Sequence, residues 1–476
     1  MRLKTRFAVL AVAALLTLPA PAQMQVVVSA PRGEPITLTF KPGGGRLSSI
    51  TGRPYSATET LEQSLPNGTH IVMASTQISR DSVGRMRTER TEWIPQSPTG
   101  FPVIEITDPV AGYRYVLDPP HQTAHRLAVS IPVSAAPKTP RPCQMGRPTA
   151  SNMHDGITAI HESLGSRMIE GVSACGDRTT MTYPAGSMFG NDRPLSLVSE
   201  TWAAWDELGT IVLGTHAEPR GGTTTGGLKN VRLGEPDAAL FRPPAGYHIV
   251  DETTEFAITV ARPSGPSPKP APEVTALTGM PYSAEEVLAT DNTLADGTRL
   301  KHTISSTLIY RDLVGRTRKE RVFEDGGTFR VFRVEIVDAA AGCRYVLDVD
   351  QKTARRSPVQ VQLAPAREAS IPSHPVQRLS TEWLGTQTID GMITYGERST
   401  TTFGPGSMSA NDRPIVYLNE RWTSPQLGIA MLSKLSNPRG GNSIATIKSL
   451  KFGEPDAALF RVPEGYRIVD DPVPTP

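Results

Sequence analysis

An internal duplication constrains this chain more than any other feature of its sequence. Six short motifs occur twice, in the same order and with spacings that shift by only a few residues. The longest, Gly-Glu-Pro-Asp-Ala-Ala-Leu-Phe-Arg, fills 234–242 and again 453–461. The other pairs are 54–57 with 281–284, 67–69 with 296–298, 80–85 with 311–316, 111–118 with 341–348, and 191–194 with 411–414. Each copy has roughly 200 residues, a normal size for a domain, so we predict two tandem domains and not a solenoid.

The ends of the chain and the segment between the copies have distinct compositions. Residues 1–22 combine basic residues, a short apolar run and an Ala-x-Ala ending, which predicts a cleaved signal peptide. An uncleaved anchor or a buried helix is the alternative. We expect no membrane-spanning segment, because the apolar run is shorter than the ~20 residues that a membrane helix needs. The expected location is therefore periplasmic or secreted. The expected divisions of the mature chain are an N-terminal arm at 23–51, copy 1 at 52–260, a proline-rich linker at 261–273, copy 2 at 274–470 and a disordered tail at 471–476.

The predicted signal peptide also explains the small excess of positive charge. The whole chain has 49 Lys and Arg against 47 Asp and Glu, and three of those bases lie within 1–22. Removing them leaves 46 bases against 47 acids, a net charge of −1. We therefore expect no nucleic-acid partner, since such proteins present a strongly basic surface.

Three cysteines limit the covalent chemistry. Cys143 and Cys175 lie in the same copy, which makes them the one pair suited to an intradomain disulfide in an exported protein. The alternative is that all three, including Cys343, are small buried residues. No Cys-x-x-Cys occurs, so neither a thioredoxin-like nor a zinc site is expected.

Both copies have the alternating apolar and polar pattern of antiparallel strands. In copy 1, the segments 70–78 and 85–93 alternate in this way and are separated by a turn at 80–84. The fold class that we predict is mainly β, with two tandem, strongly curved antiparallel sheets, each a half-open β-barrel carrying short helices.

Two kinds of short helix are expected on each sheet. Ser followed three residues later by Glu, at 56–59 and 283–286, has the pattern of a capping box. The segment 236–241 begins with proline, which suits the first position of a helix because its missing N–H costs nothing there.

A family resemblance rests on two segments of copy 2. The run 382–391, Glu-Trp-Leu-Gly-Thr-Gln-Thr-Ile-Asp-Gly, and the ending 454–466 resemble the lipoprotein-carrier-like superfamily of periplasmic proteins. They also resemble exported bacterial proteins with the same Gly-Thr…Ile-x-Gly and Glu-Pro-Asp-x-x-Leu-Phe motifs. The resemblance implies a half-open β-barrel with an apolar concave face and carries over no ligand residue.

Pairs of arginines are the first candidate ligand residues. Arg85 and Arg87 are two residues apart, which places them on one face of a strand, and Arg316 and Arg318 repeat this in copy 2. Guanidinium pairs bind carboxylates and phosphates. Ion pairs across a solvated sheet, with acidic residues that continue the same faces, are the alternative.

Two tryptophans at matched positions, Trp202 and Trp422, are the other candidates. They belong either to the core of each copy or to the mouth of a half-open barrel. His121 and His125 are four apart, but on a strand this spacing does not converge on a metal, so we predict no metal. No nucleophile elbow or phosphate-binding loop is present, and we expect no catalytic residue and no cofactor.

These observations predict an exported, non-enzymatic binding protein. Its expected partner is a lipid, a lipidated peptide or a hydrophobic segment. One alternative is a protein–protein interaction or scaffold module of the cell envelope. The other is a hydrolase built from unmatched residues, for which His154, Asp155 and His161 are the candidates.

Overall fold

The computed structural model describes residues 25–29, 36–41, 49–92, 101–135, 143, 146–253, 255–260, 274–325, 328–359, 361–365, 378–407 and 411–470. The predicted signal peptide at 1–22, the whole linker at 261–273 and the tail at 471–476 lie outside these residues. The chain divides into two compact units, which are considered separately. Unit 1 comprises Met1–Tyr183, Ser196–Lys269 and Ser409–Asp412, and unit 2 comprises Pro184–Leu195, Pro270–Met408 and Arg413–Pro476.

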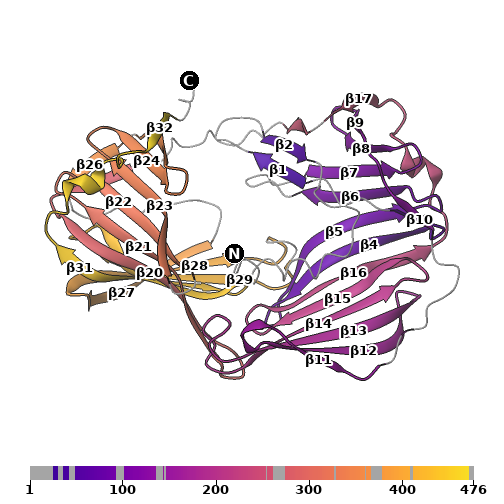
Figure 1. Ribbon diagram of the computed structural model, residues 1–476, viewed down its shortest axis with the longest axis horizontal. Coiled ribbons are helices and arrows are strands. Elements are labelled where there is room, and N and C mark those ends of the chain that lie inside the picture. Colours follow the sequence, from indigo (N-terminus) through magenta and orange to yellow (C-terminus); the bar gives the residue numbers. More distant parts are fainter. Residues whose placement is uncertain are drawn as a thin grey trace. The chain divides into compact units, whose positions relative to one another are not determined.

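Unit 1 is built around a curved sheet of thirteen strands (Figure 1). Its strand order is β11-β12-β13-β14-β15-β16-β4-β5-β6-β7-β8-β9-β17. These strands are β4 (Tyr55–Ser64), β5 (His70–Arg80), β6 (Met86–Glu92), β7 (Phe101–Asp108), β8 (Tyr113–Asp118), β9 (Thr123–Ala128), β11 (Thr149–Asn152), β12 (Thr158–Ile169), β13 (Val172–Tyr183), β14 (Leu195–Ala204), β15 (Thr210–Glu218), β16 (Gly222–Leu233) and β17 (His248–Glu252).

Two smaller sheets complete unit 1. One consists of β1 (Gln25–Ser29), β2 (Ile36–Lys41) and β18 (Phe256–Val260), and the other of β3 (Ser49–Thr51) and β10 (Val133–Ala135). Leu38 and Phe40 of β2 are fully buried and belong to one apolar cluster with Val103 and Val116 of the large sheet. Burial of these side chains holds the small three-stranded sheet against the large one.

Unit 2 repeats the design with a twelve-stranded sheet in the order β27-β28-β29-β30-β31-β20-β21-β22-β23-β24-β25-β32. These strands are β20 (Tyr282–Thr293), β21 (Arg299–Arg311), β22 (Thr317–Asp325), β23 (Thr328–Asp338), β24 (Cys343–Asp348), β25 (Thr353–Pro358), β27 (Arg378–Ile389), β28 (Met392–Phe403), β29 (Ile415–Ser424), β30 (Ile429–Asn437), β31 (Gly441–Phe452) and β32 (Arg467–Asp470). A separate pair is formed by β19 (Val274–Thr278) and β26 (Val361–Pro365).

The predicted fold class is confirmed: both units are mainly β, with curved, largely antiparallel sheets that do not close into barrels. The last strand of each large sheet is an exception, since β17 runs parallel to β9 and β32 runs parallel to β25. These strands follow long excursions of the chain and not tight hairpins, so they can enter the edge in the parallel direction.

The helices are much reduced compared with the prediction. The segment 236–241 forms one 3-10 turn, η2 (Ala238–Phe241), and copy 2 has the equivalent η3 (Ala457–Phe460). Asp237 caps η2, because its side chain accepts a hydrogen bond from the Ala239 N–H at 2.9 Å. A further 3-10 turn, η1 (His154–Gly156), lies between β11 and β12.

The two predicted capping boxes are wrong. Residues 56–59 lie in β4 and residues 283–286 lie in β20. Tyr55 and Ala57 are buried while Ser56 and Thr58 are less so, which is the two-residue period of a strand. β4 also pairs on both sides, with β16 and β5, and these ladders outweigh a local Ser–Glu helix signal.

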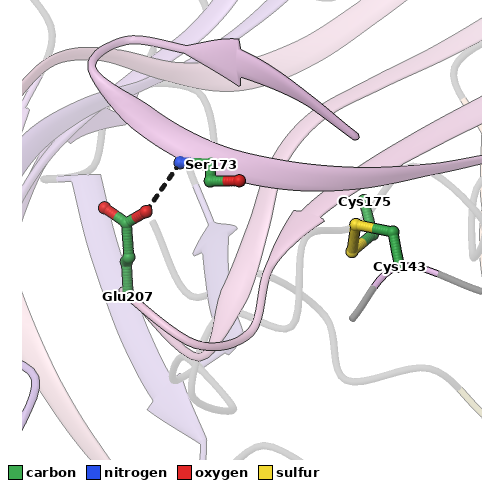
Figure 2. The surroundings of a disulfide bond; sticks show 4 residues. All are labelled: Cys143, Ser173, Cys175 and Glu207. Carbon is green, nitrogen blue, oxygen red and sulfur yellow. Dashed lines mark hydrogen bonds between the residues drawn. A yellow bond between two sulfur atoms is a disulfide. The ribbon is translucent and has the colours of Figure 1, made fainter. Parts of the chain in front are cut away.

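The disulfide, one of two alternatives for the cysteines, is present in the structure. Cys143 is bonded to Cys175 of β13, with the two Cα atoms 5.3 Å apart (Figure 2). Cys343 is a free, half-buried thiol in β24. The disulfide therefore belongs to unit 1 alone.

Candidate functional site

The four candidate arginines fasten the 3-10 turns to the sheets. In unit 1, the Arg85 guanidinium pairs with Asp81 at 2.5 Å and lies over the ring of Phe241, 5.2 Å from its centre. Arg87 pairs with Glu89 at 2.5 Å and donates to the backbone carbonyl of Leu240 at 3.2 Å. We call this set of contacts the arginine clamp.

Unit 2 builds the same clamp with the matched residues. Arg316 pairs with Asp312 at 2.5 Å and lies over the ring of Phe460, and Arg318 donates to the Leu459 carbonyl at 2.9 Å. The Arg87 and Arg318 side chains are only 12% and 10% exposed. Because these guanidinium groups already have internal partners in both units, the contacts favour a scaffold role over ligand binding.

The two matched tryptophans pack on glycines of the neighbouring strand. Trp202 is buried, and a Cβ placed on Gly176 would lie 2.5 Å from its ring. Trp422 and Gly396 have the same relation in unit 2, also at 2.5 Å. Arg167 covers Trp202, 4.1 Å from the ring centre. Trp202 belongs to the apolar core cluster of unit 1, whereas Trp422 is half-buried.

Differences between the copies identify surfaces that the scaffold does not require. The glycine–tryptophan pairs, and β-bulges at Ser163/Gly165 and Trp383/Gly385, show that β12–β13 corresponds to β27–β28. The unit 2 positions Trp383, Ile393 and Tyr395 therefore correspond to Ser163, Ser173 and Cys175 of unit 1.

In unit 2 these positions form an exposed apolar surface, which we call the edge patch. Trp383 pairs directly with Glu397 across β27 and β28, and Ile393 and Tyr395 lie four and two residues before Glu397 on β28. All three side chains therefore lie on one face of the sheet. They are exposed by 69% (Trp383), 56% (Ile393) and 45% (Tyr395). Unit 1 presents two serines and a disulfide there.

A second candidate site is an open cleft of about 520 Å³ in unit 1. It is lined by Asp118, His121, Thr123, His125, Ala257, Ile258 and Thr259. His121 Nδ1 lies 2.7 Å from an Asp118 carboxylate oxygen, and His125 Nδ1 lies 2.8 Å from a carboxylate oxygen of Glu252. His125 also stacks on Phe256, with ring centres 4.4 Å apart. The sequence analysis noted that the two histidines are four residues apart, but it did not predict that each would have a carboxylate partner.

Proline explains why Asp118 takes a histidine as its partner. In unit 2 the equivalent Asp348 accepts hydrogen bonds from the N–H groups of Asp350 and Gln351, at 3.1 and 2.9 Å. The position of Asp350 is occupied by Pro120 in unit 1, which has no N–H to donate. The backbone turn has the same form in both units, with a left-handed residue at Gln122 and Lys352, and the His121 ring is a side-chain partner of Asp118 in unit 1.

Neither metal binding nor hydrolysis gains support from these groups. Within the described part of the chain, no group of three His, Cys, Asp or Glu side chains could hold a metal ion. His154 and Asp155 are exposed in η1, and His161 Nδ1 lies 2.9 Å from the Thr179 hydroxyl on the neighbouring strand. The three hydrolase candidates thus form no acid–base–nucleophile arrangement with one another.

Searches for related proteins add little to this geometry. No family model matches the chain, and no curated protein matches it. Among solved structures, the chain is similar to a domain from Vibrio parahaemolyticus described as an outer membrane lipoprotein-sorting protein domain. The identity is 9% and the TM-score 0.17, over 38% of this chain and 89% of that one. This likeness carries no argument about function, and membership of the lipoprotein-carrier-like superfamily stays a prediction.

Among the described residues, no helix is long and apolar enough to cross a membrane.

Proposed function

We propose that this protein is an exported, non-enzymatic binding protein of the cell envelope, and that its second unit binds a hydrophobic ligand through the edge patch. The ligand class is a lipid, a lipidated peptide or a hydrophobic polypeptide segment. The observation that carries the proposal is the exposure of Trp383, Ile393 and Tyr395 together on one face of β27 and β28.

The exposure of three large apolar side chains on one surface needs an explanation, because it costs free energy. Large apolar side chains left in water forgo roughly 1.5–3 kcal/mol each relative to burial. Single exposed apolar residues are common, but a group of them on one surface is typical of an interaction site. Unit 1 shows that the same two strands fold with small side chains, Ser163 and Ser173, at two of the three positions. The scaffold therefore does not need the apolar residues of unit 2.

The absence of enzymatic activity is part of the proposal. The residues that both copies share serve the arginine clamp and the packing of tryptophan on glycine. The histidines of the unit 1 cleft have carboxylates as their Nδ1 partners, and Thr123 beside them donates its hydroxyl to the His121 carbonyl at 3.1 Å. The Thr123 hydroxyl is therefore already bonded to a backbone carbonyl, which does not favour its use as a nucleophile.

Binding of a fluorescent fatty acid and of a labelled apolar peptide to the purified full chain tests the proposal. We expect Trp383→Ser, which installs the unit 1 residue, to weaken binding of at least one probe about tenfold. Trp205→Ser is the matched control, because Trp205 is an exposed tryptophan of unit 1, 49% accessible. Failure of both probes to bind the unmodified chain would refute the proposal, as would equal losses in the two variants.

A further inference from the structure

Strand register allows one face of the two large sheets to be compared position by position. In unit 1, a row of directly opposed residues across β5 to β9 consists of Ile78, Thr88, Glu105, Val116 and His125. The matching row of unit 2, across β21 to β25, consists of Ile309, Lys319, Glu335, Val346 and Arg355. A second row consists of Thr76, Arg90 and Val103 in unit 1, and of Thr307, Arg321 and Arg333 in unit 2. The two rows share a face because their members lie two residues apart on each strand.

Unit 1 buries this face under its small three-stranded sheet. Val103 and Val116 belong to one apolar cluster with Leu38 of β2 (Figure 1). Arg90 is only 11% exposed, and its guanidinium lies 2.5 Å from a carboxylate oxygen of Glu105. In unit 1, therefore, this face receives a layer of polypeptide whose apolar side chains match its own.

The same face of unit 2 is exposed and basic. Basic side chains that are exposed occupy four positions of the two rows, namely Lys319, Arg321, Arg333 and Arg355. The residues of unit 1 at these positions are Thr88, Arg90, Val103 and His125. Arg344 of β24 lies on the same face, because it is opposite Val337, two residues after Glu335. We call Lys319, Arg321, Arg333, Arg344 and Arg355 the basic face.

Two carboxylates share this face and leave it with an excess of positive charge. Glu335 pairs with Arg344, with nitrogen and oxygen 2.8 Å apart. Asp348 lies opposite Arg333, and its carboxylate accepts the N–H groups of Asp350 and Gln351. Five basic residues are thus set against two acidic ones on β22 to β25.

Two of the arginines are placed where they repel each other. Arg321 of β22 lies directly opposite Arg333 of β23. Like charges at directly opposed positions destabilise a sheet. In unit 1 the matched pair is Arg90 and Val103, so the fold does not require two arginines there. An anion bound between the two guanidinium groups would offset their repulsion.

We propose that the basic face binds an acidic segment of a partner polypeptide. Guanidinium groups bind carboxylates through paired hydrogen bonds. The basic side chains extend over four neighbouring strands, a width of about 14 Å at roughly 4.8 Å per strand, so a chain carrying several carboxylates matches them better than one small anion does. Unit 1 favours a polypeptide as the occupant, because its own chain forms a layer on the same face. The basic face lies on β22 to β25 and the edge patch on β27 and β28, so the inference goes beyond the proposed function.

A pair of peptides tests the charge requirement. The first is a rhodamine-labelled peptide of four Ser-Glu repeats, titrated against the full chain by fluorescence anisotropy at low ionic strength. The second has Gln in place of every Glu. We expect the Glu peptide to bind and the Gln peptide not to bind. The affinity for the Glu peptide should fall as the ionic strength is raised to about 0.15 M, where the Debye length is about 8 Å.

A double variant tests the location of the site. Lys319→Thr/Arg333→Val installs the residues that unit 1 carries at these positions, and Arg333→Val alone is the second variant. We expect the double variant to lose about tenfold in affinity for the Glu peptide, about threefold for each exposed charge pair removed. Lys448→Thr/Lys451→Thr is the matched control, since it removes two exposed lysines of β31 that lie opposite Glu285 and Ser283, on the other face of the sheet.

Several results would overturn the inference. Equal binding of the two peptides would show that charge is not recognised, and equal losses in the two double variants would show attraction to net charge alone. Displacement of the Glu peptide by equimolar inorganic phosphate would identify a small anion as the occupant. Failure of the Glu peptide, together with binding of phosphatidylglycerol vesicles that the basic-face double variant loses, would identify a lipid surface.

Discussion

Reduction of the Cys143–Cys175 disulfide should destabilise unit 1 and leave unit 2 unchanged. The bonded residues are separated by 32 positions, so the loop-closure model assigns the bond about 4 kcal/mol at 25 °C through the entropy of the unfolded chain. The two Cα atoms lie 5.3 Å apart, within the usual range, so the fold need not distort to make the bond. For a unit of this size, the loss corresponds to a fall in melting temperature of roughly 8–16 °C.

Differential scanning calorimetry of the full chain can separate the two effects, because two units with their own cores are expected to unfold in separate transitions. We expect reductant and the double variant Cys143→Ala/Cys175→Ala to lower the same transition. Cys343→Ala, which alters the free thiol of unit 2, is the control and should leave that transition in place. A loss below about 1 kcal/mol, or an equal shift of both transitions, would contradict the reasoning.

Three further predictions concern contacts within the two units. Gly396→Ala should cost about 1–3 kcal/mol in urea denaturation, because its Cβ would lie 2.5 Å from the Trp422 ring; an unchanged midpoint would show that the ring can move. Asp456→Ala should cost about 1 kcal/mol, since the carboxylate caps η3 through the Ala458 N–H at 2.9 Å, and Asp456→Asn should restore most of it. Burial raises the pKa of Tyr55 above its ordinary value of 10.0, so the unfolded chain ionises first and stability should fall as the pH rises above 10. Tyr55→Phe should reduce that fall in denaturation series from pH 9 to 11, and an identical slope in the variant would contradict the assignment.

Much of the fold could be predicted because the repeated motifs are the contacts that each copy must make. Arg87 and Arg318 recur because each holds a 3-10 turn by donating to a backbone carbonyl. Asn191 recurs because its side chain donates to the carbonyls of Pro184 and Arg193 and so stabilises a turn. The capping-box signal at 56–59 failed because helix caps act locally, whereas β4 gains ladders with strands far away in the sequence.

The edge patch could not be found by the same reasoning. Trp383 lies in the 382–391 motif, in which the glycine and the threonine carry the family resemblance. No feature of the neighbouring sequence distinguishes an exposed tryptophan from a buried one. The informative signal is the mismatch between copies, in which Trp383 replaces Ser163 and Tyr395 replaces Cys175. Reading that mismatch requires a residue-by-residue equivalence, and the register of β27 with β28 supplies it.

The order of strands has a consequence for how each unit folds. In unit 1, the strands from β4 to β9 follow one another in the sheet, as do those from β11 to β16, so most of their pairing is between neighbours in the chain. The two runs are joined by the ladder between β16 and β4, in which Gly226 lies opposite Leu61. Unit 2 has the same plan, with β20 joined to β31. Loop-closure entropy delays contacts of such long sequence separation, so each half-sheet should form quickly and the joining ladder should limit the rate. Until this joining ladder forms, β4 and β20 each have a paired strand on one side only. At this stage the folding chain is most prone to pairing strands of copy 1 with strands of copy 2.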